Sequence, residues 1–189
     1  YREMSKVLNF DETITPVTYI NSAADLKAFC GEHGGIVCTS TNAPKILEWG
    51  FSQREKILFF PDQHLGRWSG YKMGIPLEQM PVWDPDLPMG GLTEQQIKDA
   101  KILLWKGHCS VHQMFRKQNI EQFRAQHPDG KVISHPETAF EVCINSDYVG
   151  STEYILRTVS EAEPGTKWRV GTELNLFTRL AEEMIPQNK

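Results

Sequence analysis

The residues with the clearest chemical potential lie in one short segment, residues 106–112, where a cysteine stands between two histidines. Cys109 follows an apolar run, and a neighbouring imidazolium of His108 or His112, or a helix N-terminus, would lower the pKa of its thiol. A thiolate so placed can ligate a metal or act as a nucleophile. The alternative is a buried structural cysteine flanked by capping histidines. The segment lacks Cys-x-x-Cys and His-Glu-x-x-His patterns, so it cannot complete a closed metal site alone.

A second group of candidate residues follows the apolar run at residues 131–134. His135 and Glu137 stand two residues apart there, and imidazole and carboxylate are the usual groups for general acid-base work. The alternative is that Glu137 opens the next helix as a first-turn acid while His135 binds a backbone carbonyl. Asp62 and His64 form a similar cluster after another apolar run. For this pair we favour a structural role, as a helix N-cap and in contacts between domains.

Small polar residues follow several of the apolar runs. At helix N-termini, free N–H groups and the helix dipole bind phosphates or carboxylates, and hydroxyl groups add further donors. Plain N-capping is the alternative for any single turn. The residues that we place at such helix N-termini are Asn21, Ser22, Ser40, Thr41, Ser151, Thr152 and Thr172.

The elements that position these residues alternate between short β-branched runs and segments of helical period, which indicates an α/β fold with parallel sheets. The pattern favours small repeated αβα units. Strands are expected at Pro16 to Ile20, Gly35 to Thr39, Lys56 to Pro61, Met80 to Trp83, Lys101 to Lys106, Lys131 to Ser134, Asp147 to Val149 and Trp168 to Gly171. Helices are expected at Ala23 to Phe29, Ala43 to Trp49, Glu94 to Ala100, Asn119 to Gln126, Glu153 to Ala162 and Leu174 to Met184.

Composition narrows the class of protein. With 40% hydrophobic and 23% charged residues, the chain is typical of a folded globular protein rather than a disordered one. Its net charge of −4 and scattered basic residues argue against a nucleic-acid partner. No apolar run is long enough to cross a membrane, and the first residues do not resemble a signal peptide, so we expect a cytoplasmic protein. Four dispersed cysteines exclude a disulfide scaffold.

The sequence also predicts a division into domains. Residues 83–91 are rich in proline and glycine and must be irregular. A break near residues 107–112 predicts two α/β domains, 1–110 and 111–189. The chain opens on tyrosine rather than methionine, which suggests that it was cut from a longer protein.

Seven ordered motifs, taken together, resemble those of the quinolinate synthase family, the A protein of de novo NAD biosynthesis. They cover the chain from Thr18 to its end. The matching segments are residues 18–22 (Thr-Tyr-Ile-Asn-Ser), 38–43 (Cys-Thr-Ser-Thr-Asn-Ala), 61–66 (Pro-Asp-Gln-His-Leu-Gly), 106–112 (Lys-Gly-His-Cys-Ser-Val-His), 135–137 (His-Pro-Glu), 149–152 (Val-Gly-Ser-Thr) and 171–173 (Gly-Thr-Glu).

The resemblance implies three α/β domains in a pseudo-threefold arrangement around a [4Fe-4S] cluster, with this chain supplying the second and third. It implies the condensation of iminoaspartate with dihydroxyacetone phosphate to quinolinate, with loss of phosphate and water. The enzyme that supplies iminoaspartate is a possible partner. Because the first domain and a C-terminal segment are absent, we expect this piece alone to be inactive.

The resemblance also implies roles for individual residues. Cys109 matches a cluster ligand, and the other two ligand cysteines of the family lie outside this chain. Cys30, Cys38 and Cys143 fall outside the ligand motifs, so we interpret them as ordinary residues. The remaining matches are Tyr19, His135 and Glu137 as catalytic residues, and Tyr19, Asn21, Ser40, Ser151 and Thr152 as substrate-binding residues.

Two other classes of protein stay open. One is a zinc-dependent lyase or hydrolase that uses His108, Cys109 and His112 together with His135 or Glu137. The other is a non-catalytic α/β module that binds phosphate or dicarboxylates at its hydroxyl-bearing turns. The metal content separates the first of these classes from an iron-sulfur enzyme, since iron with sulfide differs from zinc alone.

Overall fold

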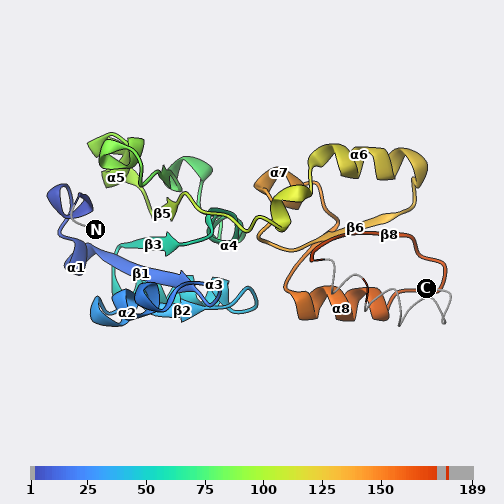
Figure 1. Cartoon of the computed structure of the whole chain (residues 1–189), viewed down its shortest axis with the longest axis horizontal. Coiled ribbons are helices and arrows are strands. Elements are labelled where there is room, and N and C mark those ends of the chain that lie inside the picture. Colours follow the sequence, from blue (N-terminus) through green and yellow to red (C-terminus); the bar gives the residue numbers. More distant parts are fainter. Residues whose placement is uncertain (1–2, 174–177, 179–189) are drawn as a thin grey trace. The chain divides into compact units, whose positions relative to one another are not determined.

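The computed structural model describes residues 3–173 and 178 (Figure 1). The chain divides into two compact units, Tyr1–His108 and Cys109–Lys189, which we call the N-terminal and C-terminal units. Each unit has its own parallel sheet, so the predicted α/β fold class is confirmed. The helix expected over Leu174 to Met184 lies outside the described residues.

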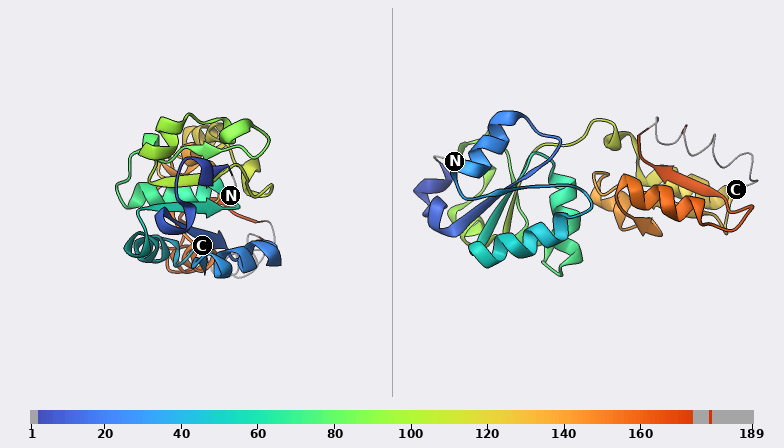
Figure 2. Two further views of the ribbon diagram at one scale, coloured as in Figure 1. Left: turned by 90° about the vertical axis from the view of Figure 1, so that its left-hand side faces the viewer. Right: turned by 90° about the horizontal axis from the view of Figure 1, so that it is seen from below.

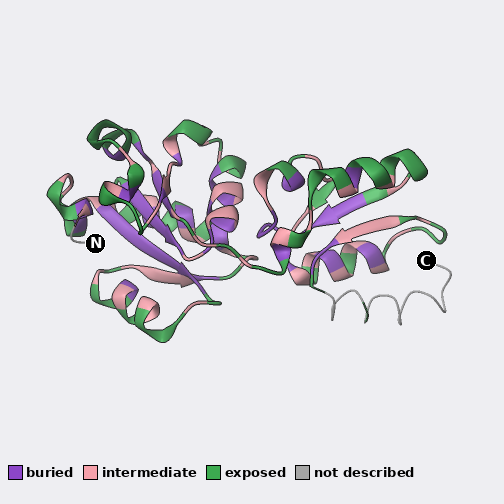
Figure 3. Cartoon of the chain, turned by 45° about the horizontal axis from the view of Figure 1, so that its top comes forward, coloured by how far each residue is buried: buried purple, intermediate pink, exposed green. Residues whose placement is uncertain are grey.

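The N-terminal unit is built on five parallel strands in the order β2-β1-β3-β5-β4. Strands β1 and β3 are buried along their whole length, as are the first three residues of β5 (Figure 3). Burial on both faces explains why these strands read as continuous apolar runs rather than as alternating ones. The strands are β1 Ile14–Tyr19, β2 Ile36–Cys38, β3 Lys56–Phe60, β4 Val82–Trp83 and β5 Ile102–Trp105.

Helices cover both faces of this sheet (Figure 2). Alternate strand residues serve different cores, so that Phe59 packs with helices α3 and α4 while Phe60 packs with α2 and α5. The unit is therefore a three-layer αβα sandwich. Its helices are α1 Phe10–Thr13, α2 Ala24–Glu32, α3 Ala43–Gln53, α4 Gln63–Lys72 and α5 Glu94–Asp99, with 3₁₀ turns at Met4–Lys6, Leu77–Gln79 and Pro88–Gly91.

The C-terminal unit has three parallel strands in the order β7-β6-β8, again between helices. Ile133 packs with Ile155 and Val159 of α8, whereas Val132 packs with Ile120 of α6. These adjacent residues of β6 face opposite sides of the sheet. The elements are a 3₁₀ turn at His112–Met114, α6 Lys117–Gln126, β6 Lys131–Ser134, α7 Phe140–Cys143, β7 Tyr148–Val149, α8 Thr152–Ser160 and β8 Trp168–Gly171.

All eight predicted strands are present, with ends within two residues of those expected. Helix α4 is missing from the expected helices, although the N-cap role favoured for Asp62 implies its start, because Gly66 and Gly70 interrupt its pattern and disfavour a helix. The structure explains both glycines. A Cβ atom on Gly66 would lie 2.6 Å from side-chain atoms of Leu104 and Phe59, and both glycines therefore allow the helix to pack closely on the sheet. Among the described residues, every helix is too short or too polar to span a bilayer.

Candidate active site

The site in the C-terminal unit lies where its three strands end. The backbone N–H of His135 donates to the carbonyl of Gly171 (2.9 Å), and that of Gly150 donates to Ser134 (3.1 Å). The residues that follow β6, β7 and β8 therefore meet at one edge of the sheet. This edge is where open parallel sheets bind ligands.

A tight turn fixes Glu137 directly after β6. Both the backbone N–H and the hydroxyl of Thr138 donate to the carbonyl of His135, at 3.0 and 2.8 Å. The next helix, α7, begins only after its N-cap Ala139. The alternative interpretation, in which Glu137 opens that helix as a first-turn acid, was therefore wrong. Glu137 is instead a buried carboxylate held in a loop, 6% exposed.

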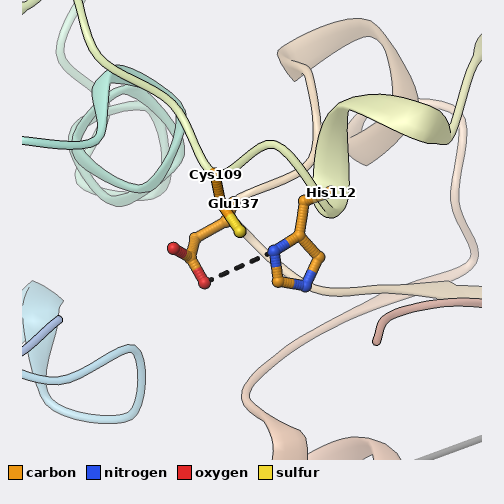
Figure 4. A group of neighbouring side chains, drawn as sticks. All are labelled: Cys109, His112 and Glu137. Carbon is orange, nitrogen blue, oxygen red and sulfur yellow. Dashed lines mark ion pairs between the residues drawn. The ribbon is translucent and has the colours of Figure 1, made fainter. Parts of the chain in front are cut away.

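Three potential metal ligands converge beside this turn (Figure 4). The ligand atoms of Cys109, His112 and Glu137 all lie within 4.8 Å of one another. His112 Nδ1 is 3.5 Å from Glu137 Oε2. The 3₁₀ turn that carries His112 is anchored by a hydrogen bond from Gln113 N to the carbonyl of Cys109 (3.2 Å). The structure thus brings together Cys109 and Glu137, two of the predicted site residues, and places His112 beside them.

His135 approaches the same carboxylate oxygen of Glu137 as His112 does. Its Nδ1 lies 3.2 Å from Glu137 Oε2 and 3.3 Å from the backbone N of Glu137. It can accept the backbone N–H or, when it carries a proton, donate to the carboxylate. The ring of His135 stacks on that of His112, with centroids 4.6 Å apart and an angle of 16° between planes. A proton between these two groups can therefore lie on His135 Nδ1 or on Glu137 Oε2.

Burial keeps both imidazoles neutral. Desolvation lowers the pKa of His112 to about 4. Desolvation, and then the charge of His112, lower the pKa of His135 to about 3. Neutral imidazole is the form that ligates a metal or accepts a proton. Both ring nitrogens of His112 are buried without a hydrogen-bond partner among the described residues, which is expected of a group that awaits a ligand.

The donor set fits one corner of an iron-sulfur cluster. Such clusters are held by cysteine thiolates, and Cys109 is half-exposed at this edge. Burial raises the pKa of Cys30 and Cys38 to about 12, so both remain protonated thiols in the N-terminal unit. Cys143 is buried, with its Sγ 3.2 Å from Thr138 Oγ1. Within the described residues, one cysteine is thus available at this site, and further thiolates would have to come from outside it.

The predicted hydroxyl groups of the C-terminal unit lie at the same edge of the sheet as His135 and Glu137. Ser151 is the N-cap of α8 and accepts from the N–H of Tyr154 (3.4 Å), and Thr152 is the first helical residue. Thr172, directly after β8, is buried, and its hydroxyl has no hydrogen-bond partner within residues 3–173. Ser151 and Thr172 thus offer hydroxyl groups at the edge of the sheet that carries His135.

The other predicted site residues lie in the N-terminal unit, also after strands. Tyr19 is the last residue of β1 and is 6% exposed, Asn21 is exposed in the following turn, and Ser40 lies in the turn after β2. The expectation that the polar residues of these turns stand at helix N-termini was wrong in detail. Ala23 and Asn42 occupy the N-cap positions of α2 and α3.

Asp62 behaves as the sequence predicted. It is the N-cap of α4, and its Oδ1 accepts the backbone N–H groups of His64 and Leu65, both at 2.8 Å. From the sequence, His112 was considered only as a neighbour of Cys109 and as a zinc ligand. Its spacing of three residues from Cys109, on one tight turn, was the signal that could have placed it beside Glu137.

Comparisons with known proteins agree with these motifs. A family model described as "Quinolinate synthetase A protein" matches residues 2–189. A quinolinate synthase of Rhodopirellula baltica is 54% identical over 184 residues, which cover 97% of this chain and 47% of the relative. One of Halalkalibacterium halodurans is 52% identical over 176 residues, covering 93% of this chain and 48% of the relative.

The chain thus spans about half the length of the curated relatives that it matches. The match extends over nearly all of the chain, including the segments that carry Cys109, His112, His135 and Glu137. The chain belongs to the quinolinate synthase family.

Proposed function

We propose that the complete protein condenses iminoaspartate with dihydroxyacetone phosphate to give quinolinate, with loss of phosphate and water. The observation that carries this proposal is the buried cluster of His112, His135 and Glu137 beside Cys109, in a chain of this family. The reaction is a transfer and condensation with several proton movements. It therefore needs a group that can hold and release a proton near the reacting atoms.

Cys109 would be the one ligand that this chain gives to a [4Fe-4S] cluster, with the other thiolates supplied by parts of the protein outside it. When bound, the cluster would supply a Lewis acid that polarises a substrate oxygen. His112 and Glu137 would lie beside it, because their ligand atoms are within 4.8 Å of the sulfur of Cys109.

His135 and Glu137 would move the protons. Glu137 Oε2 lies 3.2 Å from His135 Nδ1, so a proton taken by the carboxylate can pass to the neutral imidazole. The stacked ring of His112 fixes the plane of His135. Burial excludes water from both histidines and so strengthens their interactions with a charged substrate.

Hydroxyl groups would bind the anionic ends of the substrates. Ser151 and Thr152 stand at the N-terminus of α8, a helix of nine residues, whose dipole favours a carboxylate or phosphate. Tyr19, Asn21 and Ser40 would contribute from the N-terminal unit. Tyr19 is also proposed as a catalytic residue because its phenol can donate a proton.

The two units would be the second and third domains of a pseudo-threefold enzyme, divided near residue 110. The chain spans about half the length of each matched relative, which supports the proposal that the complete enzyme has a further domain. The 189-residue chain alone would then be inactive, and the complete enzyme would receive iminoaspartate from the enzyme that makes it.

The test is product formation by the complete enzyme. Incubation of the anaerobically prepared protein with both substrates should yield quinolinate, identified by mass spectrometry, and one phosphate for each quinolinate. Formation of phosphate without quinolinate, or no consumption of iminoaspartate, would contradict the proposal.

A zinc enzyme is a second candidate, favoured by one observation. Cysteine, histidine and glutamate within 4.8 Å are all common zinc ligands, and three protein ligands are the number found in catalytic zinc sites. Metal analysis of the purified complete protein separates the candidates. Iron with an equal amount of acid-labile sulfide supports the cluster, whereas stoichiometric zinc without sulfide supports the zinc enzyme.

A further inference from the structure

Three basic side chains, His64, Arg67 and His108, belong to the N-terminal unit and have no role in the function proposed above. His64 and Arg67 lie three residues apart on α4, which places them on one face of that helix. Arg67 and His108 are close enough to His64 for their charges to contribute to the lowering of its pKa, after desolvation. All three groups can donate hydrogen bonds to an anion.

The backbone brings these residues together at the carboxyl end of the sheet. His64 follows β3 and His108 follows β5, and these strands are hydrogen-bonded neighbours. The backbone N–H of Gln63 donates to the carbonyl of Gly107 (3.0 Å). A Cβ atom on Gly107 would lie 2.1 Å from the carbonyl oxygen of Pro61, so only glycine allows this close approach. The segment before His108 is thereby fixed against the start of α4.

Within the part of the chain that the structure describes, no ion pair joins His64, Arg67 or His108 to an acidic side chain. Arg67 is half-buried, and among the described residues it makes no ion pair and no hydrogen bond. His64 Nδ1 is buried and likewise has no hydrogen-bond partner there. Asp62, the nearest acid in the sequence, accepts the backbone N–H groups at the start of α4. A half-buried guanidinium without a partner is costly, and a bound anion would remove that cost.

From these observations we infer that His64, Arg67 and His108 form a binding site for a phosphate group. The guanidinium offers a planar pair of donors that matches two phosphate oxygens. An imidazole donates at least one N–H in either protonation state, so His64 and His108 can bind a third oxygen. The place, at the carboxyl end of two adjacent parallel strands, is the usual one for ligands of such sheets. The inference does not rest on the proposed function.

The test is a titration of the 189-residue chain with inorganic phosphate, followed by calorimetry and by NMR of the histidine rings. We expect saturable binding that shifts the ring signals of His64 and His108 and leaves that of His127, in the C-terminal unit, unchanged. Arg67→Gln should weaken binding roughly tenfold or more, the scale of a lost hydrogen bond to a charged group. Arg157→Gln removes an equal charge from an exposed position on α8 and should bind like the unaltered chain.

Two further ligands identify the source of the phosphate. A phosphate monoester such as glycerol 3-phosphate that binds tenfold tighter than inorganic phosphate would show that the site holds the phosphate end of an organic molecule. Equal affinity would assign the site to free phosphate. Malonate that binds as tightly as phosphate would overturn the assignment to phosphate. Unchanged His64 and His108 signals in the unaltered chain would overturn the site itself, whether or not Arg67→Gln folds, and so would equal binding by Arg67→Gln and Arg157→Gln.

Discussion

At the scale of single residues, the site depends on a carboxylate shared by two imidazoles. Glu137 Oε2 lies 3.2 Å from His135 Nδ1 and 3.5 Å from His112 Nδ1. All three side chains are less than a tenth exposed. A proton between Glu137 and His135 is therefore shielded from water, where interactions between polar groups are stronger than at the surface.

Replacement of Glu137 tests this proton transfer. Glu137→Gln in the complete enzyme keeps the shape of the side chain but cannot accept a proton, so kcat should fall roughly 10²-fold or more. Steady-state rates of quinolinate formation measure this. Glu141→Gln, an exposed position on α7, is the matched control and should keep the normal rate. Equal rates in the two variants would leave Glu137 with a structural role only.

The buried histidines also predict how stability depends on pH. The folded-state pKa values of His112 and His135, about 4 and about 3, lie below the value of about 6.5 expected for an unfolded chain. Below pH 6.5 the unfolded state therefore binds more protons than the folded state does. The stability that the two neutral histidines contribute is complete above pH 6.5 and is lost as the pH falls toward 4. Each histidine should add about 1.4 kcal/mol per pH unit to the slope.

Urea unfolding of the 189-residue chain between about pH 7 and pH 4.5 measures that slope. His112→Gln should reduce it, whereas His127→Gln, at the end of α6, should retain it. A slope unchanged by His112→Gln would mean that this imidazole is already charged in the folded protein, and neutral metal-ligand chemistry would not apply to it.

At the scale of elements, the strands could be predicted more completely than the helices. Runs such as Lys56 to Phe60 are apolar on both faces, and no other element fits so short a run between turns. Only the start of helix α4, at Asp62, could be predicted. Its glycines are explained by contacts with the sheet and its surroundings, those of Gly66 with Phe59 and Leu104 and those of Gly70 with Met80 and Ile102. Helix propensity depends on the local sequence and therefore cannot indicate such contacts.

The site residues show the same limit. His135 and Glu137 could be located from their place after a strand, since strand ends meet at one edge in a parallel sheet. The approach of His112 to Glu137 joins segments 25 residues apart in the sequence, through a turn without a regular period. Spacing therefore paired Glu137 with His135 and did not predict its contact with His112.

The N-cap of α4 gives a prediction about stability. Asp62 is 3% exposed and satisfies two helix N–H groups at 2.8 Å, so Asp62→Ala should cost about 1–2 kcal/mol of unfolding free energy. Chemical denaturation of the 189-residue chain measures the cost. Asp129→Ala, in an exposed turn, is the control and should change stability by less than about 0.5 kcal/mol. A loss no greater than the control's would show that the cap is dispensable.

The hydroxyl groups of Ser40, Ser151 and Thr152 give a prediction about ligand binding. Ser40→Ala, Ser151→Ala and Thr152→Ala should each weaken the binding of quinolinate to the complete enzyme roughly tenfold or more, because each removes a hydrogen bond to a charged group. Fluorescence or calorimetric titration measures the affinity, and the absorbance of the cluster should not change. Thr158→Ala, later on α8, is the control. Normal affinity in all three variants would show that these hydroxyl groups do not bind quinolinate.

At the scale of the whole molecule, we propose that the chain carries one part of a larger site. Its two αβα units each place polar residues after their strands, and the C-terminal unit brings Cys109 beside His112 and Glu137. A cubane cluster with one open iron needs three thiolates, whereas the described residues bring one to this edge. The account therefore predicts that the cluster depends on Cys109 and also on cysteines beyond this chain.

Iron and sulfide analysis of the complete enzyme after anaerobic reconstitution tests this claim most directly. The unaltered enzyme should hold about four iron and four sulfide ions, and the Cys109→Ser variant should lose them. The control is Cys143→Ser, at a buried cysteine that is hydrogen-bonded to Thr138, and this variant should retain them. The 189-residue chain, treated in the same way and desalted, should retain no cluster. A stoichiometric cluster that survives Cys109→Ser, in the complete enzyme or in the chain alone, would contradict the account.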